Sequence, residues 1–383
     1  MCFGVPKPAD VVIYDECNSQ FVRHAINSKY QVGIFNQRPA NVFLGLKIIL
    51  GVIKGLTKLQ LSEVVKHPRG ILVGFLSQLL FLHDKSCLLF MHPKAVVTFI
   101  DNSASFSRLA NSCRAIPFIA IQNGSRLSYA ASQDRIYHQH YFCFGDHETH
   151  LLPRLGWQVE HYYPVGSLIA SLHFKLPQIV QKSERDMLLV STWRGNIGYT
   201  KDVQDTMRSM RIMDEYLADF IRTRNITATV ILRAERDSEH WFMPELGLAE
   251  DEYFRDIYGD SIEIIDTDFS VRNIFPLMQT SDLIVSCLSS ALMEALGIGK
   301  KICYFNFTGT DLYHQDIDEQ LICKDANRES FFERLDDLLA ILPSEYARKA
   351  GGLRVFYMSN DEAIPTYQRI RDGIDQIIEG QPT

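Results

Sequence analysis

Short runs of β-branched and aromatic residues alternate along the chain with longer segments of helical periodicity. A strand, a helix and a further strand in succession predict parallel pairing through crossover helices, because adjacent parallel strands need a long connection. We therefore expect an α/β fold with doubly wound parallel sheets. The strand-like runs are residues 10–15, 30–35, 95–101, 118–124, 141–145, 159–166, 186–192, 228–234, 262–268, 282–286 and 301–306.

The length of 383 residues exceeds one ordinary core and suits two domains of roughly 150 to 200 residues each. Residues 167–185 lack a clear period and contain Pro177, so we place the linker there. The sequence then predicts a Rossmann-like domain over residues 1–175 and a second one over 176–360. An amphipathic segment over 361–383 is expected to be a helix that packs across the domains.

Charge and cysteine usage narrow the class of protein. The formal charge of −7 offers no basic face for nucleic acid, so we expect no such partner. Eight cysteines are scattered without a CxxC pair, which is typical of free thiols in a reducing cytoplasm. The N-terminus also lacks the pattern of a signal peptide. These features predict a cytoplasmic protein.

Two apolar stretches stand out in the first half, residues 42–56 and 71–83. Both are shorter than the roughly 18 uncharged residues that a spanning helix needs, and Lys47 and Lys54 interrupt the first. We expect core helices. The alternative is a face that lies in a membrane interface, which would give peripheral contact with a membrane.

Polar residues follow several of the predicted strands of the first domain. Ligands of open parallel sheets bind beyond the carboxyl ends of the strands, so these residues predict a rim that faces a cleft. Asp101 is our first candidate for a catalytic carboxylate, with Asp15 and Glu16 in reserve and Gln122 as an orienting amide. Turns and helix caps are the alternative explanation for such residues.

In the second domain, serines separate a strand from a helix. Ser286, Ser289 and Ser290 lie where a helix N-terminus would offer unpaired N–H groups to a phosphate. Glu294 follows one turn later, where a carboxylate could accept hydrogen bonds from a ribose diol. The alternative is an ordinary serine cap followed by a solvated glutamate.

Two arginines follow strands of the same domain. Arg194 and Arg233 could each hold a phosphate or a sugar carboxylate in two-point contact, or could form structural ion pairs. The Asp-Thr-Asp run at 266–268 is similar to a metal-binding DxD motif, but a capping role is the simpler account, and we predict no metal site. The sequence contains no G-x-G-x-x-G and no Walker A motif, which disfavours dinucleotide oxidoreductases and P-loop kinases.

Residues 281–306, SDLIVSCLSSALMEALGIGKKICYFN, resemble the nucleotide-binding segment of GT-B-type glycosyltransferases and their relatives. The resemblance implies two Rossmann-like domains facing a cleft. It also implies a donor phosphate at Ser289 and Ser290 and a ribose at Glu294. Sugar transferases, nucleotide-sugar 2-epimerases and glycerophosphate polymerases share this pattern.

The first half carries five segments in order that resemble a bacterial surface-carbohydrate biosynthesis family, similar to transferases of Kdo and related 3-deoxy-ulosonic acids. The resemblance implies transfer from a CMP-linked donor, without metal or further cofactor, to a saccharide or glycolipid acceptor of lipopolysaccharide or capsule. In a bacterium, the alternative given above for the two apolar stretches would mean peripheral contact with the inner membrane. The segments are residues 11–19, 34–43, 96–106, 119–126 and 141–167.

Three alternatives stay open. A nucleotide-sugar 2-epimerase would turn over a UDP-sugar without an acceptor. A glycerophosphotransferase would be expected to have a histidine beside the Gln-Asn-Gly loop, where this chain has Gln122. A non-catalytic carbohydrate-binding protein could keep the same fold.

Overall fold

The structure is a computed structural model of the chain. The side chains of residues 201–203 and 244–249 are not described. The described residues are 4–36, 42–57, 70–126, 136–174, 184–193, 201–233, 244–268, 272–311, 314, 316–361 and 363–380.

The first sheet has six parallel strands in the order β2-β1-β3-β4-β5-β6. Residues of β1 pair on both sides, with Val12 opposite Gly33 of β2 and Val96 of β3. The strand order reverses at β1, so crossover helices cover both faces of the sheet. The strands are β1 (Val11–Tyr14), β2 (Val32–Phe35), β3 (Ala95–Thr98), β4 (Phe118–Ile121), β5 (Tyr137–Cys143) and β6 (Gln158–Pro164).

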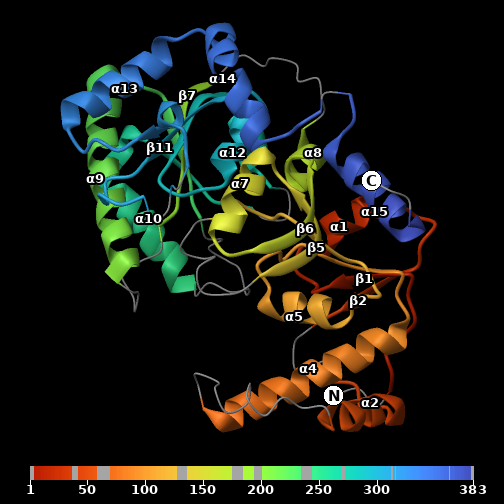
Figure 1. The fold of residues 1–383 in the computed structure, drawn as a ribbon. Coiled ribbons are helices and arrows are strands. Elements are labelled where there is room, and N and C mark those ends of the chain that lie inside the picture. The colour runs from red at the N-terminus through yellow and green to blue at the C-terminus, as the bar shows by residue number, and fades with distance from the viewer. Residues whose placement is uncertain are drawn as a thin grey trace.

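The second sheet also has six parallel strands, in the order β12-β11-β10-β7-β8-β9. This is the Rossmann strand order, and it reverses between β7 and β10. The expected α/β class with two doubly wound sheets is confirmed (Figure 1). The strands are β7 (Arg185–Val190), β8 (Ala228–Ile231), β9 (Glu263–Ile265), β10 (Ser281–Ser286), β11 (Lys301–Phe305) and β12 (Ile322–Cys323).

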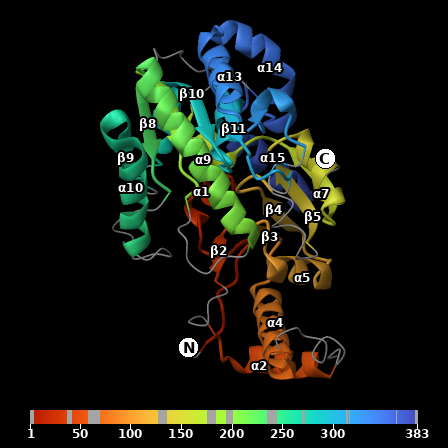
Figure 2. The same cartoon turned by 90° about the vertical axis from the view of Figure 1, so that its left-hand side faces the viewer.

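Helices surround both sheets (Figures 1 and 2). One short helix, α8, falls in the segment where we expected an irregular linker, because Ser167 caps it by accepting a hydrogen bond from the amide of Ala170. The first domain has α1 (Ser19–His24), α2 (Leu46–Leu56), α4 (Ile71–Met91), α5 (Ala104–Ser112), α7 (Asp146–Arg154) and α8 (Leu168–His173). The remaining helices are α9 (Lys201–Arg224), α10 (Pro244–Tyr258), α11 (Ile274–Gln279), α12 (Ala291–Gly297), α13 (Arg328–Ala340), α14 (Pro343–Tyr357) and α15 (Thr366–Glu379), with 3₁₀ turns at Gly259–Ser261 and Glu319–Leu321.

The C-terminal helix α15 returns to the first domain (Figure 1). The hydroxyl of Thr366 donates to the carbonyl of Val165 at 2.7 Å, and the amide of Asn27 donates to Asp375 at 2.8 Å. One apolar cluster joins one face of the first sheet to the core of the second, and another cluster covers the opposite face of the first sheet. The two sheets are therefore held by shared packing.

Helices α2 and α4 form a hairpin that projects from the first domain (Figures 1 and 2). We expected both apolar stretches to be core helices, and this expectation is wrong for their outer faces. Leu46 of α2 is 72% exposed and Leu72 of α4 is 71% exposed. The physical reason is that no layer of the described chain covers the outer side of the hairpin.

Candidate functional site

A pocket of about 320 Å³ lies where the strand order of the second sheet reverses, and we call it the cleft pocket. Loops after β7, β8 and β10 supply most of its wall, and the first domain contributes Asn123 and Ile169. The position is the one expected for a ligand of a doubly wound sheet. The predicted residues Arg233, Ser289, Ser290 and Glu294 all line this pocket, as do Ser191, Asp268 and Arg272.

The predicted serines have different surroundings. Ser286 is buried, and its hydroxyl donates to the carbonyl of Val190 at 2.7 Å, which ties β10 to β7. Ser289 accepts a hydrogen bond from the amide of Ala291 at 3.3 Å. Ser290 precedes α12 without a side-chain capping bond, and its hydroxyl lies 3.3 Å from where a Cβ on Gly124 would be. Ser286 is therefore a structural contact, whereas Ser289 and Ser290 reach the pocket.

The glutamate one turn into α12 also faces the domain interface. Glu294 accepts a hydrogen bond from the hydroxyl of Ser167, in the first domain, at 2.5 Å. Burial raises the pKa of Glu294, while Ser167 and the charge of Arg272 oppose the shift. The bond from Ser167 could not be found in the sequence, because the two residues are 127 positions apart.

Two arginines belong to the cleft pocket, and only one of them was predicted. The backbone N–H of Arg233 donates to Glu250 at 2.9 Å, and the hydroxyl of Ser191 donates to the same carboxylate. Arg272 donates to Asn18 of the first domain at 2.9 Å and thereby links the two domains. No motif in the sequence around Arg272 indicated that this residue would reach the pocket. Arg194 lies outside the described residues.

The first candidate carboxylate, Asp101, is fully buried. Arg126 binds it through two nitrogens, with Nε 2.9 Å from Oδ2, and the hydroxyl of Tyr141 donates to Oδ2 at 2.7 Å. Both oxygens are therefore occupied, and a base must have a lone pair that reaches the substrate. The expectation that Asp101 faces the cleft is corrected. Its carboxylate is buried inside the first domain and forms an ion pair with Arg126.

A histidine extends the same buried network. Burial lowers the pKa of His138 to about 4, so its ring is neutral at physiological pH. The Nε2 atom lies 2.8 Å from the carbonyl oxygen of Asp101 and donates to it. The ring stacks on Tyr141, with centroids 5.1 Å apart. The sequence alone gave no reason to connect these residues. They lie on β5 and in the segments after β3 and β4, which become neighbours only in the folded sheet.

Gln122 is buried within the first domain as well. Its amide nitrogen donates to Glu148 at 3.0 Å, and its oxygen accepts from the backbone of Phe144 at 2.7 Å. Glu148 also accepts from the backbone N–H of Gly145, which fixes the start of α7. Gln122 thus joins the ends of β4 and β5 in this structure.

The reserve carboxylates remain accessible at the end of β1. Asp15 has a positive φ of 79°, and its side chain accepts from the backbone of Cys17 at 2.9 Å. Glu16 is exposed and accepts from the amide of Asn36 at 2.9 Å. Asn18, three residues after Asp15, contacts Arg272 of the cleft pocket. The end of β1 therefore approaches the second domain.

The two lysines of the Gly-Lys-Lys turn lie at the amino end of β11, with Lys300 just before the strand and Lys301 as its first residue. Lys300 donates to the carbonyls of Gln279 and Ser281, and Lys301 forms an ion pair with Asp282 at 2.7 Å. These lysines lie at the opposite end of the sheet from the cleft pocket. Within the described ranges, no group of His, Cys, Asp or Glu is arranged to hold a metal ion.

No protein-family model and no curated protein sequence matches the chain. Solved structures share its fold at low sequence identity. A UDP-GlcNAc 2-epimerase from Neisseria meningitidis, bound to UDP-GlcNAc, aligns over 97% of this chain and 99% of its own with a TM-score of 0.52 and 11% identity. The S. aureus protein MnaA, solved with UDP, covers 97% and 98% with a TM-score of 0.55 and 11% identity.

A glycosyltransferase from Rickettsia africae aligns over 98% of this chain and 100% of its own. Its TM-score is 0.50 and its identity is 12%. At such low identity the similarity concerns the fold. The chain therefore has the two-domain, GT-B-like arrangement of these proteins over nearly its whole length.

Proposed function

We propose that the protein is an enzyme of nucleotide-activated sugars, and specifically a glycosyltransferase. The observation that carries the proposal is the cleft pocket, where Ser289, Ser290 and Glu294 lie across from Asn123 of the first domain. Hydroxyl and carboxylate groups of this kind match the phosphate and ribose of a nucleotide. The solved proteins of the same fold that are bound to UDP-GlcNAc and UDP support this choice of ligand class.

In the proposed complex, the second domain holds the donor. Ser289 and Ser290 donate to the diphosphate or phosphate, Glu294 accepts from the ribose hydroxyls, and Arg233 with Arg272 balances the anionic charge. Arg194 is proposed as a further donor contact. Fixed donors around the departing nucleotide stabilise the negative charge that develops as the glycosidic bond breaks.

The first domain would present the saccharide acceptor. We assign the base that accepts the acceptor's proton to Asp15 or Glu16, because both lie at the accessible end of β1. Asp101 and Gln122 would act as positioning residues, through Arg126 and Glu148 respectively. This assignment replaces Asp101 with half-buried Asp15 or exposed Glu16 on the same rim.

The donor nucleotide is tested by a thermal-shift screen with CMP, UDP, CDP and GDP. A ligand that binds only the folded state raises the melting temperature, by an amount set by its concentration relative to Kd. Our proposal of a CMP-linked ulosonic acid such as Kdo expects CMP to stabilise the protein most. Stabilisation by UDP and not by CMP would instead assign a UDP-sugar donor, and no shift with any nucleotide would reject the donor site.

A nucleotide-sugar 2-epimerase is the second candidate, because UDP-GlcNAc 2-epimerase has the same fold. Incubation of the protein with UDP-GlcNAc alone separates the two activities. An epimerase converts the sugar without an acceptor, whereas a transferase leaves the donor intact or hydrolyses it slowly. Proton NMR of the anomeric region distinguishes the epimer from the starting material.

A further inference from the structure

Helix α2 presents an apolar stripe to solvent. The stripe residues recur at helical positions i, i+3, i+4 and i+7, which places them on one side of the helix. In a globular protein such a stripe normally faces the core, but here each of its members is between 40% and 72% exposed. The stripe consists of Leu46, Ile49, Leu50 and Ile53.

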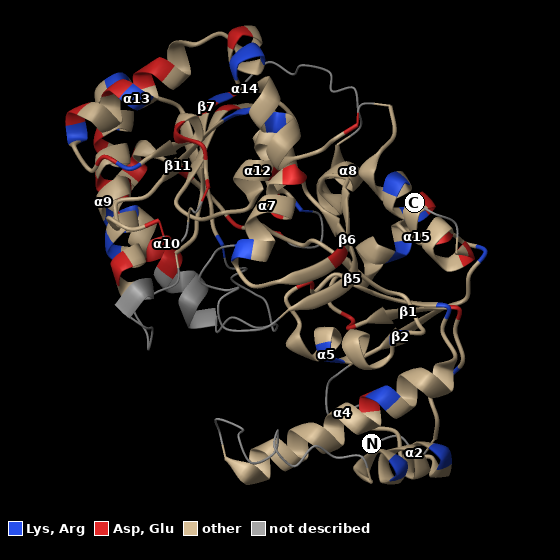
Figure 3. Cartoon of the chain, viewed as in Figure 1, with Lys and Arg blue, Asp and Glu red and all other residues tan. Residues whose placement is uncertain are grey.

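The amino-terminal half of α4 is also apolar and exposed. Within the described residues, α4 is the helix long and apolar enough to cross a membrane, yet only 22% of its apolar window is buried inside the protein. Figure 3 shows this half of the helix without charged residues. Its most exposed large side chains are Ile71, Leu72, Leu76 and Leu80.

The hairpin is a fixed unit. Gly51 and Gly55 of α2 lie against α4: a Cβ on Gly55 would be 2.4 Å from Leu82, and one on Gly51 would be 2.6 Å from Ser86. The two glycines let the side chains of Leu82 and Ser86 lie directly against the backbone of α2. The side of α2 that carries these glycines packs on α4, so the apolar stripe, on another side of the helix, faces away from this contact.

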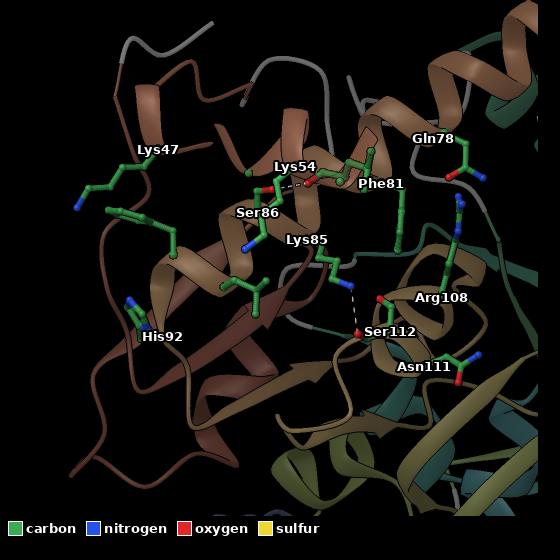
Figure 4. Close-up of a pocket in the computed structure, with 15 residues that line it drawn as sticks. Lys47, Lys54, Gln78, Phe81, Lys85, Ser86, His92, Arg108, Asn111 and Ser112 are labelled. Carbon is green, nitrogen blue, oxygen red and sulfur yellow. Dashed lines mark hydrogen bonds between the residues drawn. The ribbon is translucent and has the colours of Figure 1, made fainter. Parts of the chain in front are cut away.

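A pocket of about 880 Å³ lies between the hairpin and α5, and we call it the basic pocket (Figure 4). Lys47, Lys54, Lys85 and Arg108 line it, and none of its lining residues, all of them in the described part of the chain, is an aspartate or glutamate. Lys85 donates to the carbonyl of Ser112 at 3.2 Å. No ion pair between described residues joins Lys47, Lys54 or Lys85 to a carboxylate. The pocket therefore matches an anionic group.

The arrangement of apolar and basic groups on the hairpin indicates which kind of partner could bind there. On α2, Lys47 and Lys54 lie about a quarter turn from the apolar stripe, so hydrocarbon and phosphate would be contacted side by side. A bilayer with anionic headgroups offers hydrocarbon and phosphate next to each other, at the boundary between acyl chains and headgroups. A second copy of this chain, docked symmetrically through the same surface, would bring two copies of this basic surface together, so that like charges meet.

We propose that the α2–α4 hairpin docks the protein onto an anionic lipid bilayer. The exposed leucines and isoleucines enter the boundary between headgroups and acyl chains, and the basic pocket takes lipid phosphates. The amide of Ala9 donates to the carbonyl of Met91, so the carboxyl end of α4 lies at the start of β1. The apolar amino-terminal half therefore extends toward the carboxyl ends of the strands of the first sheet (Figure 1).

The full chain is tested by co-sedimentation with vesicles of phosphatidylglycerol and phosphatidylcholine or of phosphatidylcholine alone, without nucleotide. We expect binding to the anionic vesicles that weakens as salt rises from 0.1 to 0.5 M, where the Debye length falls to a few ångströms. Equal binding to both vesicle types, or none to either, overturns the proposal. Because no nucleotide is present, this outcome is independent of the proposed enzymatic function.

Variants of the hairpin locate the contact. Each basic residue near an anionic surface contributes roughly fivefold to partitioning, so Lys47→Gln with Lys54→Gln should weaken binding roughly 25-fold. The matched control is Lys324→Gln with Lys349→Gln, two exposed lysines of the second domain, which should change binding less than about twofold. Equal losses in the two double variants would contradict the assignment to the hairpin.

The apolar contribution is tested separately. Leu50→Ser with Ile53→Ser should reduce binding at least about tenfold, since each loses most of its hydrocarbon burial. Leu342→Ser with Val355→Ser, which alters two exposed apolar residues of the second domain, is the control.

Light scattering gives the oligomeric state. If the protein is a dimer that the hairpin variants convert to monomers, and if it does not bind vesicles, the apolar face belongs to an interface with a second copy of the chain.

Discussion

The two domains present polar residues at equivalent strand ends, but they use them differently. In the second domain, Ser289, Ser290 and Glu294 reach the cleft pocket. In the first domain, Asp101 and Gln122 are buried and bonded to partners of their own domain. A polar residue that follows a parallel strand therefore indicates where the rim of the sheet lies. Whether that residue can contact a ligand depends on which side chains of the neighbouring loops cover it.

The largest expected effect comes from breaking the buried network of the first domain. Asp101→Ala leaves the guanidinium of Arg126, whose side chain is 9% exposed, without its carboxylate. Removal of one partner of a buried ion pair should lower the free energy of unfolding by about 3–5 kcal/mol. Urea denaturation followed by circular dichroism measures the loss.

Asp15→Asn is the control at the accessible rim, because asparagine tolerates the positive φ of that position. Its free energy of unfolding should change by no more than about 0.5 kcal/mol. If Asp101→Ala lowers the free energy of unfolding by less than this control does, Asp101 does not hold the buried network together. The difference drawn here between the buried residues of the first domain and the accessible rim would then be wrong.

The second prediction tests the open rim. Glu294→Ala should weaken binding of the stabilising nucleotide by about 10- to 100-fold, since a hydrogen bond to a charged group contributes about 1.5–3 kcal/mol. Isothermal titration calorimetry measures the change. Glu329→Gln, at an exposed position of α13, should leave the affinity unaltered. Unchanged affinity in Glu294→Ala would remove this residue from the donor site.

A buried acid that accepts hydrogen bonds from two tyrosines extends the comparison. Asp214 is fully buried and accepts from Tyr253 at 2.7 Å and Tyr258 at 2.9 Å. Burial raises its pKa to about 7, above the ordinary value of 3.8. Between these values the folded state holds the proton that the unfolded state has lost, so stability should fall as pH rises, by up to about 1.4 kcal/mol per pH unit.

Asp214→Asn removes this titration, so the curve of unfolding free energy against pH should become flatter than that of the wild type between pH 4 and pH 7. Chemical denaturation at several pH values gives both curves. Parallel curves for the two proteins would show that Asp214 titrates alike in the folded and unfolded states, as an exposed carboxylate does.

The smallest effect is expected from one hydroxyl at the open rim. Ser290→Ala should weaken nucleotide binding by about 2- to 10-fold, which corresponds to the net contribution of about 0.5–1.5 kcal/mol for a hydrogen bond. Ser344→Ala, on the exposed first turn of α14, is the matched control for calorimetry. Equal affinities for the two variants would indicate that the phosphate is held by backbone groups or arginines instead.

Much of the fold could be predicted from the sequence, because parallel strands buried on both faces are continuous apolar runs. Eleven of the strands were expected at or near their observed positions, while the two-residue β12 was too short to give a pattern. The site was predicted in part. Ser290 and Glu294 could be found because they are close in sequence, whereas Arg272 and Ser167 could not, because their partners lie in the other domain.

The sequence by itself determined the alternation of strands and helices, and with it the two parallel sheets and the rim where polar residues gather. Those properties follow from local periodicity and burial. Only the tertiary structure decided which rim residues remain accessible, because Arg126 and Tyr141 reach Asp101 from other strands and loops. It also decided that the apolar faces of α2 and α4 point outward, since periodicity marks an apolar face without saying what covers it.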